Sequence, residues 1–280
     1  MEFTEHRFDF EGTQAAYLHA GAGPRLLLLH GSGPGASSRG NWRAVLGPLA
    51  ERFEVFALDL VGFGLSGRKP AAPYFDYPLW VRQAEAMLDR IDGDAPVGLV
   101  GHSLSGSIAL TLASRRPRVG AVMTTGTMGA PFEPNAATHR TWTCPTNRED
   151  LRTALQGLVF DRALVDDAYL AAREPVLFAP GYADYFNAMF GGDQRRYIEA
   201  AVLSRETLQR VSCPVLMLHG RNDIAFPPSS TLHVAEALAQ ADVLLLSRCS
   251  HSVAFEHPGK FMAQAISFFS SHIADAATLP

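Results

Sequence analysis

The chain has little of what disulfide-rich, nucleic-acid-binding and membrane proteins need. Only three of its 280 residues are cysteines, Cys144, Cys213 and Cys249, and their wide spacing forms neither a disulfide framework nor a Cys-x-x-Cys metal pattern. Lysine and arginine number 24 against 28 aspartates and glutamates, a formal net charge of −4. No basic excess is therefore available to bind a nucleic acid backbone. Apolar runs such as residues 26–29 are far shorter than the roughly 20 residues of a membrane span.

These absences predict a soluble cytoplasmic protein with no nucleic acid partner and no membrane partner. The first ten residues, MEFTEHRFDF, carry charges and lack the apolar segment of a signal peptide. We expect the three cysteines to be buried free thiols in a reducing compartment. The composition, 47% hydrophobic and 19% charged, excludes general disorder and is sufficient for a large core.

Alternating strand and helix patterns predict an α/β fold. Short apolar runs bounded by Gly, Pro or Asp indicate buried strands at 25–30, 53–60, 95–101, 119–125, 214–220 and 242–247. Helix-period segments follow at 41–52, 78–91, 104–115, 229–239 and 260–272. This order is typical of a mostly parallel, doubly wound sheet with helices on both faces. The leading residues, 7–12 and 13–20, predict a hairpin at one edge.

One segment, residues 131–205, interrupts this alternation and is too long for a loop. Helix-like pieces lie at 147–157, 166–174 and 193–203, broken by Pro145, Pro175, Pro180 and Gly191-Gly192. We therefore predict a core domain formed by 1–130 and 206–280, with 131–205 as a helical cap over the carboxyl edge of the sheet. The last residues, 274–280, predict a frayed tail.

The third predicted strand ends in Gly101-His102-Ser103-Leu104-Ser105-Gly106 and leads into a helix. A serine in a sharp strand-to-helix turn is typical of the nucleophile elbow, which needs small residues two positions to either side. Gly101 meets this requirement, whereas Ser105 replaces the usual glycine. Ser103 is the candidate nucleophile, and a tight turn without chemistry is the alternative. Ser105 and Ser107 belong to the following helix.

A serine hydroxyl needs an adjacent base, and the base needs a carboxylate that fixes its tautomer. His251 follows the last strand, and Asp223 follows the fifth, so both are expected at the sheet edge that carries Ser103. The chain order Ser103, Asp223, His251 is that of an α/β-hydrolase triad. Asp59 also ends a strand, but we interpret it as a cap for the glycine turn that follows.

The other histidines near strand ends are weaker candidates for the base. His30 and His219 stand in strand-ending His-Gly pairs, which more often brace loops. His102 adjoins Ser103, and we expect its side chain to point away from the nucleophile at such a turn.

The first predicted strand ends in the glycine-rich loop HGSGPGA (30–36), which suits an oxyanion hole because glycines let backbone N–H groups approach a developing negative charge. The N–H of Leu104 would be one donor, and the N–H of Ser32 or Gly33 the second. The sequence does not choose between these two. A phosphate loop is excluded because no Gly-Lys-Ser/Thr follows. No His/Cys cluster has metal-ligand spacing, so no metal and no cofactor are expected.

Through these and further motifs, the whole chain resembles the serine-dependent meta-cleavage product hydrolases of aromatic degradation. The resemblance is carried by HGSGPGASSRGNW (30–42), DLVGFGLS (59–66), the cap stretch from Phe160 to Arg173, HGRND (219–223) and CSHS (249–252). It implies the α/β-hydrolase fold and hydrolysis of a carbon–carbon bond in a 2-hydroxy-6-oxohexa-2,4-dienoate. The products would be a 2-hydroxypentadienoate and a carboxylic acid. Members first ketonise the dienol, then attack the C6 carbonyl, and use no cofactor.

The resemblance also implies substrate-binding residues for a small molecule that carries a carboxylate. Asn41 and Arg173 occupy the positions that hold the carboxylate end, and an arginine fork matches a carboxylate bidentately. A surface arginine, and an asparagine that caps a helix starting near Trp42, are the alternatives. Two further positions beside the triad, His102 and Ser252, replace the family's usual Asn and Trp and are also assigned to substrate binding.

Another departure from the family pattern is Arg39, which stands where a Trp is common in the glycine loop. A carboxylesterase or lactonase on the same fold is the second functional hypothesis. A non-catalytic ligand receptor is the third, because fold alone does not settle function. The sequence does not give the C6 substituent or the oligomeric state, and a homo-oligomer is compatible with it.

Overall fold

The computed structural model describes residues 2–273, so the predicted frayed tail lies outside the described residues. Eight strands form one sheet in the order β1-β2-β4-β3-β5-β6-β7-β8. Their bounds are Thr4–Phe10, Thr13–Ala20, Arg25–Leu29, Glu54–Asp59, Val97–His102, Val119–Thr125, Val215–Gly220 and Ala241–Leu246 for β1 to β8. All neighbouring pairs from β4 to β8 are parallel, whereas β2 pairs antiparallel with β1 and with β4. The predicted α/β-hydrolase architecture and edge hairpin are confirmed.

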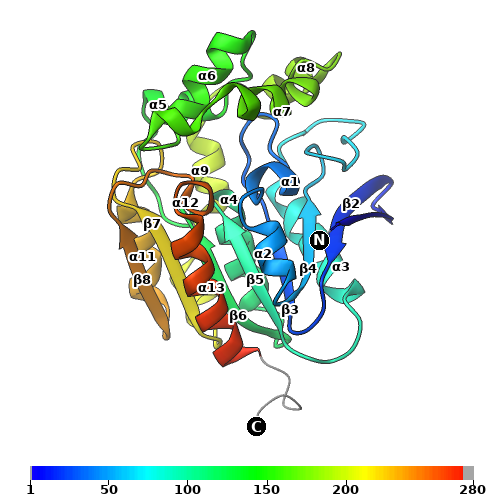
Figure 1. Cartoon of the computed structure of the whole chain (residues 1–280), viewed down its shortest axis with the longest axis vertical. Coiled ribbons are helices and arrows are strands. Elements are labelled where there is room, and N and C mark those ends of the chain that lie inside the picture. The colour runs from blue at the N-terminus through cyan, green and yellow to red at the C-terminus, as the bar shows by residue number, and fades with distance from the viewer. Residues whose placement is uncertain (1, 274–280) are drawn as a thin grey trace.

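Helices cover both faces of this sheet (Figure 1). One face packs against α3 (Tyr77–Arg90), α4 (Leu104–Ala113), α10 (Arg205–Gln209) and α11 (Pro228–Ala237). The other packs against α1 (Ser38–Asn41), α2 (Leu46–Ala50), α12 (Val253–Glu256) and α13 (Pro258–His272). In β3, Leu27 and Leu29 enter the first layer while Leu26 and Leu28 enter the second. A run of leucines is thereby buried on both faces, as the continuous apolar pattern predicts.

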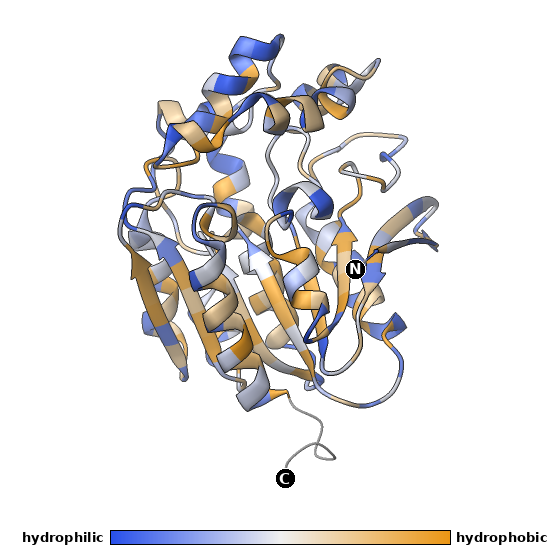
Figure 2. Ribbon diagram, viewed as in Figure 1, coloured by the Kyte–Doolittle hydropathy of each residue, from blue (hydrophilic) through white to orange (hydrophobic). Residues whose placement is uncertain are grey.

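The remaining helices come between β6 and β7. They are α5 (Ala136–Thr141), α6 (Arg148–Gln156), the short 3₁₀ helix η1 (Arg162–Leu164), α7 (Asp167–Leu177), α8 (Tyr182–Met189) and α9 (Arg195–Ala201). Figure 1 shows α5 to α8 together at the top of the view, beyond one end of the sheet. Figure 2 shows the strands of the sheet largely in the hydrophobic colour and much of α6 in the hydrophilic one. We keep 131–205 as the proposed extent of the cap.

Two helix predictions were wrong. The segment 41–52 does not form one continuous helix: α1 ends at Asn41 and α2 covers only Leu46–Ala50, because the chain passes through a turn that buries Trp42 between them. Ser37 caps α1 by accepting a hydrogen bond from the Gly40 N–H, and Asn41 ends that helix rather than capping the next. Pro175 was predicted to break a helix, but α7 continues through it to Leu177. A proline near a helix's last turn removes only one late hydrogen bond.

The cysteines are placed as the sequence predicts. All three cysteines are buried and unpaired with one another. Within 2–273 there is no helix with the length and apolar character that crossing a membrane requires.

Candidate active site

Ser103 lies between β5 and α4 in the strained turn that the sequence predicts. Its φ of 56° and ψ of −123° fall outside the regions that L-residues prefer. A Cβ on Gly101 would collide with the backbone of Ser105 and Gly106, so only glycine fits there. The turn is anchored by the Ser103 N–H, which donates to the Thr125 carbonyl at 2.9 Å. Local sequence and sheet pairing together therefore fix the serine at the end of β5.

His251 and Asp223 meet on the loops that follow β8 and β7. The Nδ1 of His251 lies 2.7 Å from Oδ2 of Asp223, and both side chains are almost fully buried. The Phe226 ring stacks on His251 at 4.4 Å between centroids, and the Phe226 N–H donates to Asp223 Oδ1. Because a carboxylate only accepts, Nδ1 carries the proton and Nε2 is left as the acceptor.

The electrostatics of Asp223 favour its charged form. Burial alone would raise the pKa of this carboxyl, but the imidazole of His251 and hydrogen bonds from His219 and His251 outweigh burial. The net effect holds the pKa of Asp223 well below its usual range. At neutral pH the carboxylate is therefore ionised and able to stabilise an imidazolium at His251.

Ser103 and His251 line one cavity under the cap, of about 60 Å³. No hydrogen bond joins their side chains in the part of the chain that the structure describes. Catalytic hydrogen bonds are often long in unliganded enzymes and tighten when substrate binds. The cavity wall brings together core and cap residues: Gly31, Ser32, Gly33, Ala36, Asn41, His102, Ser103, Thr141, Leu155, Leu158, Val159, Tyr169, Arg173, His251 and Ser252.

The expectation that His102 points away from the nucleophile was wrong. Its ring lies 4.7 Å from the ring of His251, and it lines the cavity. Nδ1 faces the carbonyl and hydroxyl of Thr125 at 3.1 and 2.9 Å. Because a carbonyl only accepts, Nδ1 carries the proton, and Nε2 has no hydrogen-bond partner among the described residues. Burial and the neighbouring His251 lower the pKa of His102 well below its ordinary value, so the ring is neutral.

The backbone amides proposed for the oxyanion hole border the same cavity. Ser32 and Gly33 line it, and Leu104 begins α4, where the first N–H groups of a helix have no partner within the helix. The Ser32 hydroxyl accepts a hydrogen bond from Trp142 Nε1 of the cap at 3.1 Å. This contact holds the glycine loop against the cap beside the nucleophile.

Arg173 reaches the cavity from α7. Its Nη2 donates to the Tyr169 hydroxyl at 2.9 Å, and Nη1 lies 3.5 Å from the Pro34 carbonyl. Its Nε is buried and has no hydrogen-bond partner. No carboxylate pairs with this guanidinium among residues 2–273. The guanidinium is half-buried at the cavity wall, and its free Nε is available to a polar group of a ligand.

Asn41 and Ser252, the other two predicted substrate-binding residues, line the same cavity as Arg173, whereas Arg39 does not. Asn41 Oδ1 accepts a long hydrogen bond of 3.4 Å from the Gly31 N–H, at the start of the glycine loop. Ser252 follows His251, and its N–H donates to the cap carbonyl of Leu158 at 3.1 Å. Arg39 is exposed and lies 3.7 Å from Glu5. Its departure from the family pattern therefore lies outside the cavity.

Sequence reasoning missed the aromatic residues that support the site. Tyr169 stands one helical turn before Arg173, stacks on Phe255 and accepts a hydrogen bond from the arginine. The i, i+4 spacing of the two residues was therefore an available signal. Trp142 carried no such local signal, because its contact with Ser32 joins residues 110 positions apart.

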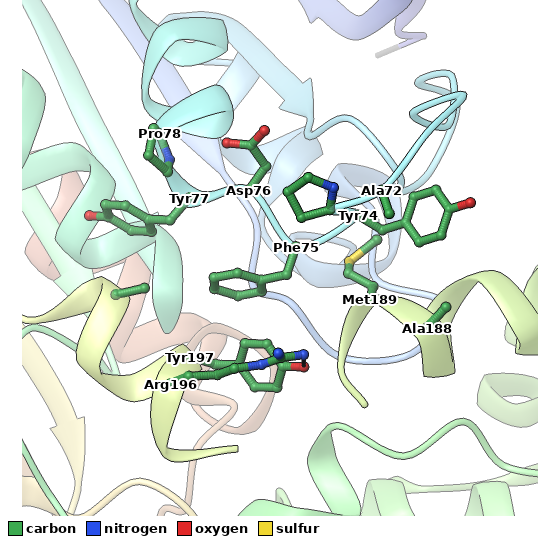
Figure 3. A pocket seen from close by; sticks show the side chains of 12 residues that line it. Ala72, Tyr74, Phe75, Asp76, Tyr77, Pro78, Ala188, Met189, Arg196 and Tyr197 are labelled. Carbon is green, nitrogen blue, oxygen red and sulfur yellow. Dashed lines mark hydrogen bonds between the residues drawn. The ribbon is translucent and has the colours of Figure 1, made fainter. Parts of the chain in front are cut away.

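Another opening, of about 580 Å³, lies elsewhere, between α8 and α9 on one side and the loop 72–76 with the start of α3 on the other (Figure 3). Phe75, Tyr77, Met189 and Tyr197 line it, and none of the candidate site residues does. Among residues 2–273, no group of three or more His, Cys, Asp or Glu side chains is arranged to hold a metal ion.

Comparison with known proteins identifies the family. The α/β hydrolase fold family matches residues 24–258. The chain is 33% identical over 264 residues to the 2-hydroxymuconate semialdehyde hydrolase of Pseudomonas sp. (strain CF600), covering 94% of this chain and 92% of that protein. It is 30% identical to the 2-hydroxy-6-oxo-2,4-heptadienoate hydrolase of Pseudomonas putida (strain F1), covering 91% and 92%.

A solved structure gives the same result. The meta-cleavage product hydrolase from Pseudomonas fluorescens IP01 superimposes with a TM-score of 0.89 at 29% identity, covering 95% of this chain and 97% of that one. The fold, the strained serine turn and these relatives agree. This chain belongs to the α/β hydrolase fold family and, within it, to the meta-cleavage product hydrolases of aromatic degradation.

Proposed function

We propose that this enzyme cleaves the C5–C6 bond of a 2-hydroxy-6-oxohexa-2,4-dienoate by acyl transfer through Ser103. One observation carries the proposal: a single cavity holds the strained serine, the Asp223-paired His251 and the Arg173 guanidinium, whose buried Nε has no partner. A nucleophile and an unpaired cation facing one space suit a substrate with both a reactive carbonyl and a carboxylate.

In the proposed reaction, the bound dienol first ketonises by moving a proton from the 2-hydroxyl to C5. His251 Nε2 then removes the Ser103 hydroxyl proton as Oγ attacks the C6 carbonyl. When the tetrahedral adduct collapses, the C5–C6 bond breaks and its electron pair moves through C3–C4 to the 2-oxo group. The His251 imidazolium gives up its proton to that oxygen, which releases the 2-hydroxypentadienoate and returns His251 to its neutral form. Water, deprotonated by His251, hydrolyses the acyl-enzyme to the carboxylic acid.

Two parts of the site would stabilise the charges that develop. Asp223, held ionised, stabilises the His251 imidazolium while the proton resides there. The N–H of Leu104, with that of Ser32 or Gly33, would donate to the C6 oxyanion. Removing one such donor typically costs about 10²- to 10³-fold in kcat.

At the other end of the substrate, we assign the carboxylate to Arg173. The guanidinium is fixed by the Tyr169 hydroxyl and by stacking over the Tyr169 ring at 5.0 Å, so its fork is held in place before substrate binds. Asn41, His102 and Ser252 complete the wall around the carboxylate and 2-hydroxyl.

The cavity also bears on the C6 substituent. Its volume of about 60 Å³ is well below the roughly 300–1,000 Å³ of most ligand pockets, so the cap must move to admit substrate. Three apolar side chains, Leu155, Leu158 and Val159, line this cavity together with Ser103, and its small volume leaves little room for a ring. We therefore propose a small C6 group, hydrogen or methyl. We also propose a reducing compartment such as the cytoplasm, supported by the three buried free thiols.

The direct test is incubation with two coloured dienoates, one with hydrogen and one with phenyl at C6, and with p-nitrophenyl acetate. We expect loss of dienoate colour with formation of 2-hydroxypentadienoate, and faster turnover of the smaller dienoate. Hydrolysis of the ester with neither dienoate consumed would favour a carboxylesterase instead. Turnover of none of the three would favour the receptor hypothesis.

A further inference from the structure

A second histidine contacts the carboxylate of Asp223, and the proposed reaction does not use it. His219 belongs to β7, and its side chain is fully buried. Its Nε2 lies 3.2 Å from Asp223 Oδ2 and 3.0 Å from the carbonyl oxygen of Phe226. The sequence predicted only that this residue braces a loop.

The surroundings of His219 fix its tautomer. Both oxygens near Nε2, those of Asp223 and Phe226, only accept hydrogen bonds at neutral pH, so Nε2 carries the proton. On the opposite side of the ring, Nδ1 lies 2.7 Å from the Thr231 hydroxyl. The Thr231 hydroxyl can donate or accept, so it satisfies Nδ1 in either case. The Nε2–H of His219 donates to the Phe226 carbonyl and lies beside the Asp223 carboxylate, with Oδ2 3.2 Å from Nε2.

These contacts form one buried chain. It runs from the Thr231 hydroxyl through His219 to Oδ2 of Asp223, which accepts from His251 Nδ1 at 2.7 Å. The other carboxylate oxygen accepts from the Phe226 N–H at 2.9 Å. Asp223 thus accepts from two donors, His251 and Phe226, and the Nε2–H edge of His219 lies 3.2 Å from its Oδ2. A buried carboxylate needs such donors to stay charged.

We propose that His219, oriented by Thr231, is a positioning residue that keeps Asp223 ionised and aimed at His251. This inference rests on the proposed role of Asp223 in the triad. His219 does not line the cavity, so it acts through Asp223 and not on the substrate.

The contact between His219 and Asp223 predicts in which direction the pH profile moves when His219 is replaced. The N–H of His219 withdraws electron density from the Asp223 carboxylate, and its hydrogen bond lowers the pKa of that carboxyl against burial. Without this donor, the carboxylate becomes more basic and holds a protonated His251 more strongly. The acid limb of the pH profile, where kcat/KM falls as the pH drops, then moves to higher pH.

The titratable groups around this pair come from several elements. They are His219 on β7, His102 at the end of β5, and Cys249 in the loop before His251. His102 is neutral because of burial, and burial raises the pKa of the Cys249 thiol, so neither carries charge near pH 7. The Asp223–His251 pair is therefore the only part of this group that changes charge in turnover.

The test compares the pH profiles of kcat/KM for four variants. All are measured on the same dienoate, so that ionisation of the substrate affects every profile equally. His219→Leu removes the donor. His219→Gln restores an amide N–H near the position of Nε2. Thr231→Val removes the hydroxyl that contacts Nδ1 of His219. Gln83→Leu is the matched control: Gln83 is fully buried and bonds to Val61 and Asp59, remote from the triad.

We expect His219→Leu to lower kcat by about 10- to 100-fold, the range for losing a hydrogen bond to a charged group. Its acid limb should move up by about half a pH unit or more. Thr231→Val should shift in the same direction by less, and His219→Gln should return the profile toward wild type. Gln83→Leu should lower Tm without moving the limb.

Superimposable profiles for His219→Leu and wild type would overturn the inference. So would equal shifts for His219→Gln and His219→Leu, which would indicate a packing role. If His219→Leu does not fold, Thr231→Val decides: an upward shift supports the inference and an unchanged limb overturns it. Asp223→Asn distinguishes failure of the His219 inference from failure of the proposed function. Full activity of Asp223→Asn would show that Asp223 is not part of the triad.

Discussion

At the scale of single residues, the unsatisfied Nε of Arg173 is the clearest sign of a ligand. If this arginine holds the substrate carboxylate, its loss should harm acidic dienoates far more than neutral esters. Removing one partner of a buried charge pair costs about 3–5 kcal/mol, against about 0–1 kcal/mol for an exposed pair. Arg173→Gln should therefore lower kcat/KM for the dienoate roughly a hundredfold or more, and leave p-nitrophenyl acetate within about a few-fold.

Arg173→Lys supplies the control for charge. Lysine carries the charge without the planar fork, so it should restore dienoate turnover only in part. An equal loss on dienoate and ester would instead assign Arg173 to packing of the cap, and no loss on either would return it to the surface.

His102 makes a separate prediction about stability. Its pKa is lowered on folding, so below its ordinary value of about 6.5 the unfolded chain binds a proton that the folded chain does not. The free energy of unfolding should therefore fall as pH drops through 6.5, by up to about 1.4 kcal/mol per pH unit from this group. His102→Asn should flatten that dependence in urea titrations between pH 7 and 5. His30, whose pKa burial also lowers, remains in both proteins. An unchanged slope would mean that His102 is protonated in the folded enzyme.

At the scale of elements, the sequence predicts the strands and the placement of Ser103, Asp223 and His251 well because each signal is local. Ser103 needs only a strand, a small residue and a helix start. Asp223 and His251 need only to follow parallel strands, whose carboxyl ends share an edge. The elbow geometry and the Asp–His contact follow from that placement.

The cap is less predictable because its residues meet only in the folded chain. The orientation of His102 depends on Thr125, which lies on the neighbouring strand β6. Trp142 and Ser32 meet across 110 residues. Pro175 lies within α7, where tertiary packing overrides the local tendency to break.

The wall formed by α6 and the following loop leads to a prediction on substrate size. Leu155 lies on α6, is buried and lines the cavity that Ser103 also lines. Leu155→Ala removes three carbons from that wall, so the ratio of kcat/KM for C6-phenyl over C6-methyl dienoate should rise about tenfold. Leu151→Ala, a buried leucine on the same helix that does not line the cavity, is the matched control and should leave the ratio unchanged. A rise in both variants would point to a loosened cap instead of a wider cavity.

At the scale of the whole molecule, the enzyme acts through one sheet edge and the helices above it. Acyl transfer through serine needs no ion, so dialysis against EDTA should leave kcat within about twofold of the untreated enzyme. Activity that is abolished by the chelator and restored by zinc would contradict the proposed mechanism.

The cap and core form one catalytic unit through a few contacts beside His251. The Ser252 N–H donates to the Leu158 carbonyl, and the Phe160 N–H donates to Glu256 Oε2 at 2.5 Å. The first contact joins residues 131–205 to the loop that carries His251, and the second joins them to α12, the short helix that follows this loop.

The central claim, that Ser103 attacks C6 of a dienoate, is tested most directly by rapid mixing of dienoate with wild type, Ser103→Ala, His251→Ala and Asp223→Asn. We predict that wild type releases 2-hydroxypentadienoate, whereas each variant loses several orders of magnitude in kcat. The Ser103→Ala/His251→Ala double variant should be little worse than the poorer single one, because the triad acts as a unit. Release of 2-hydroxypentadienoate by Ser103→Ala at the wild-type rate would contradict the account.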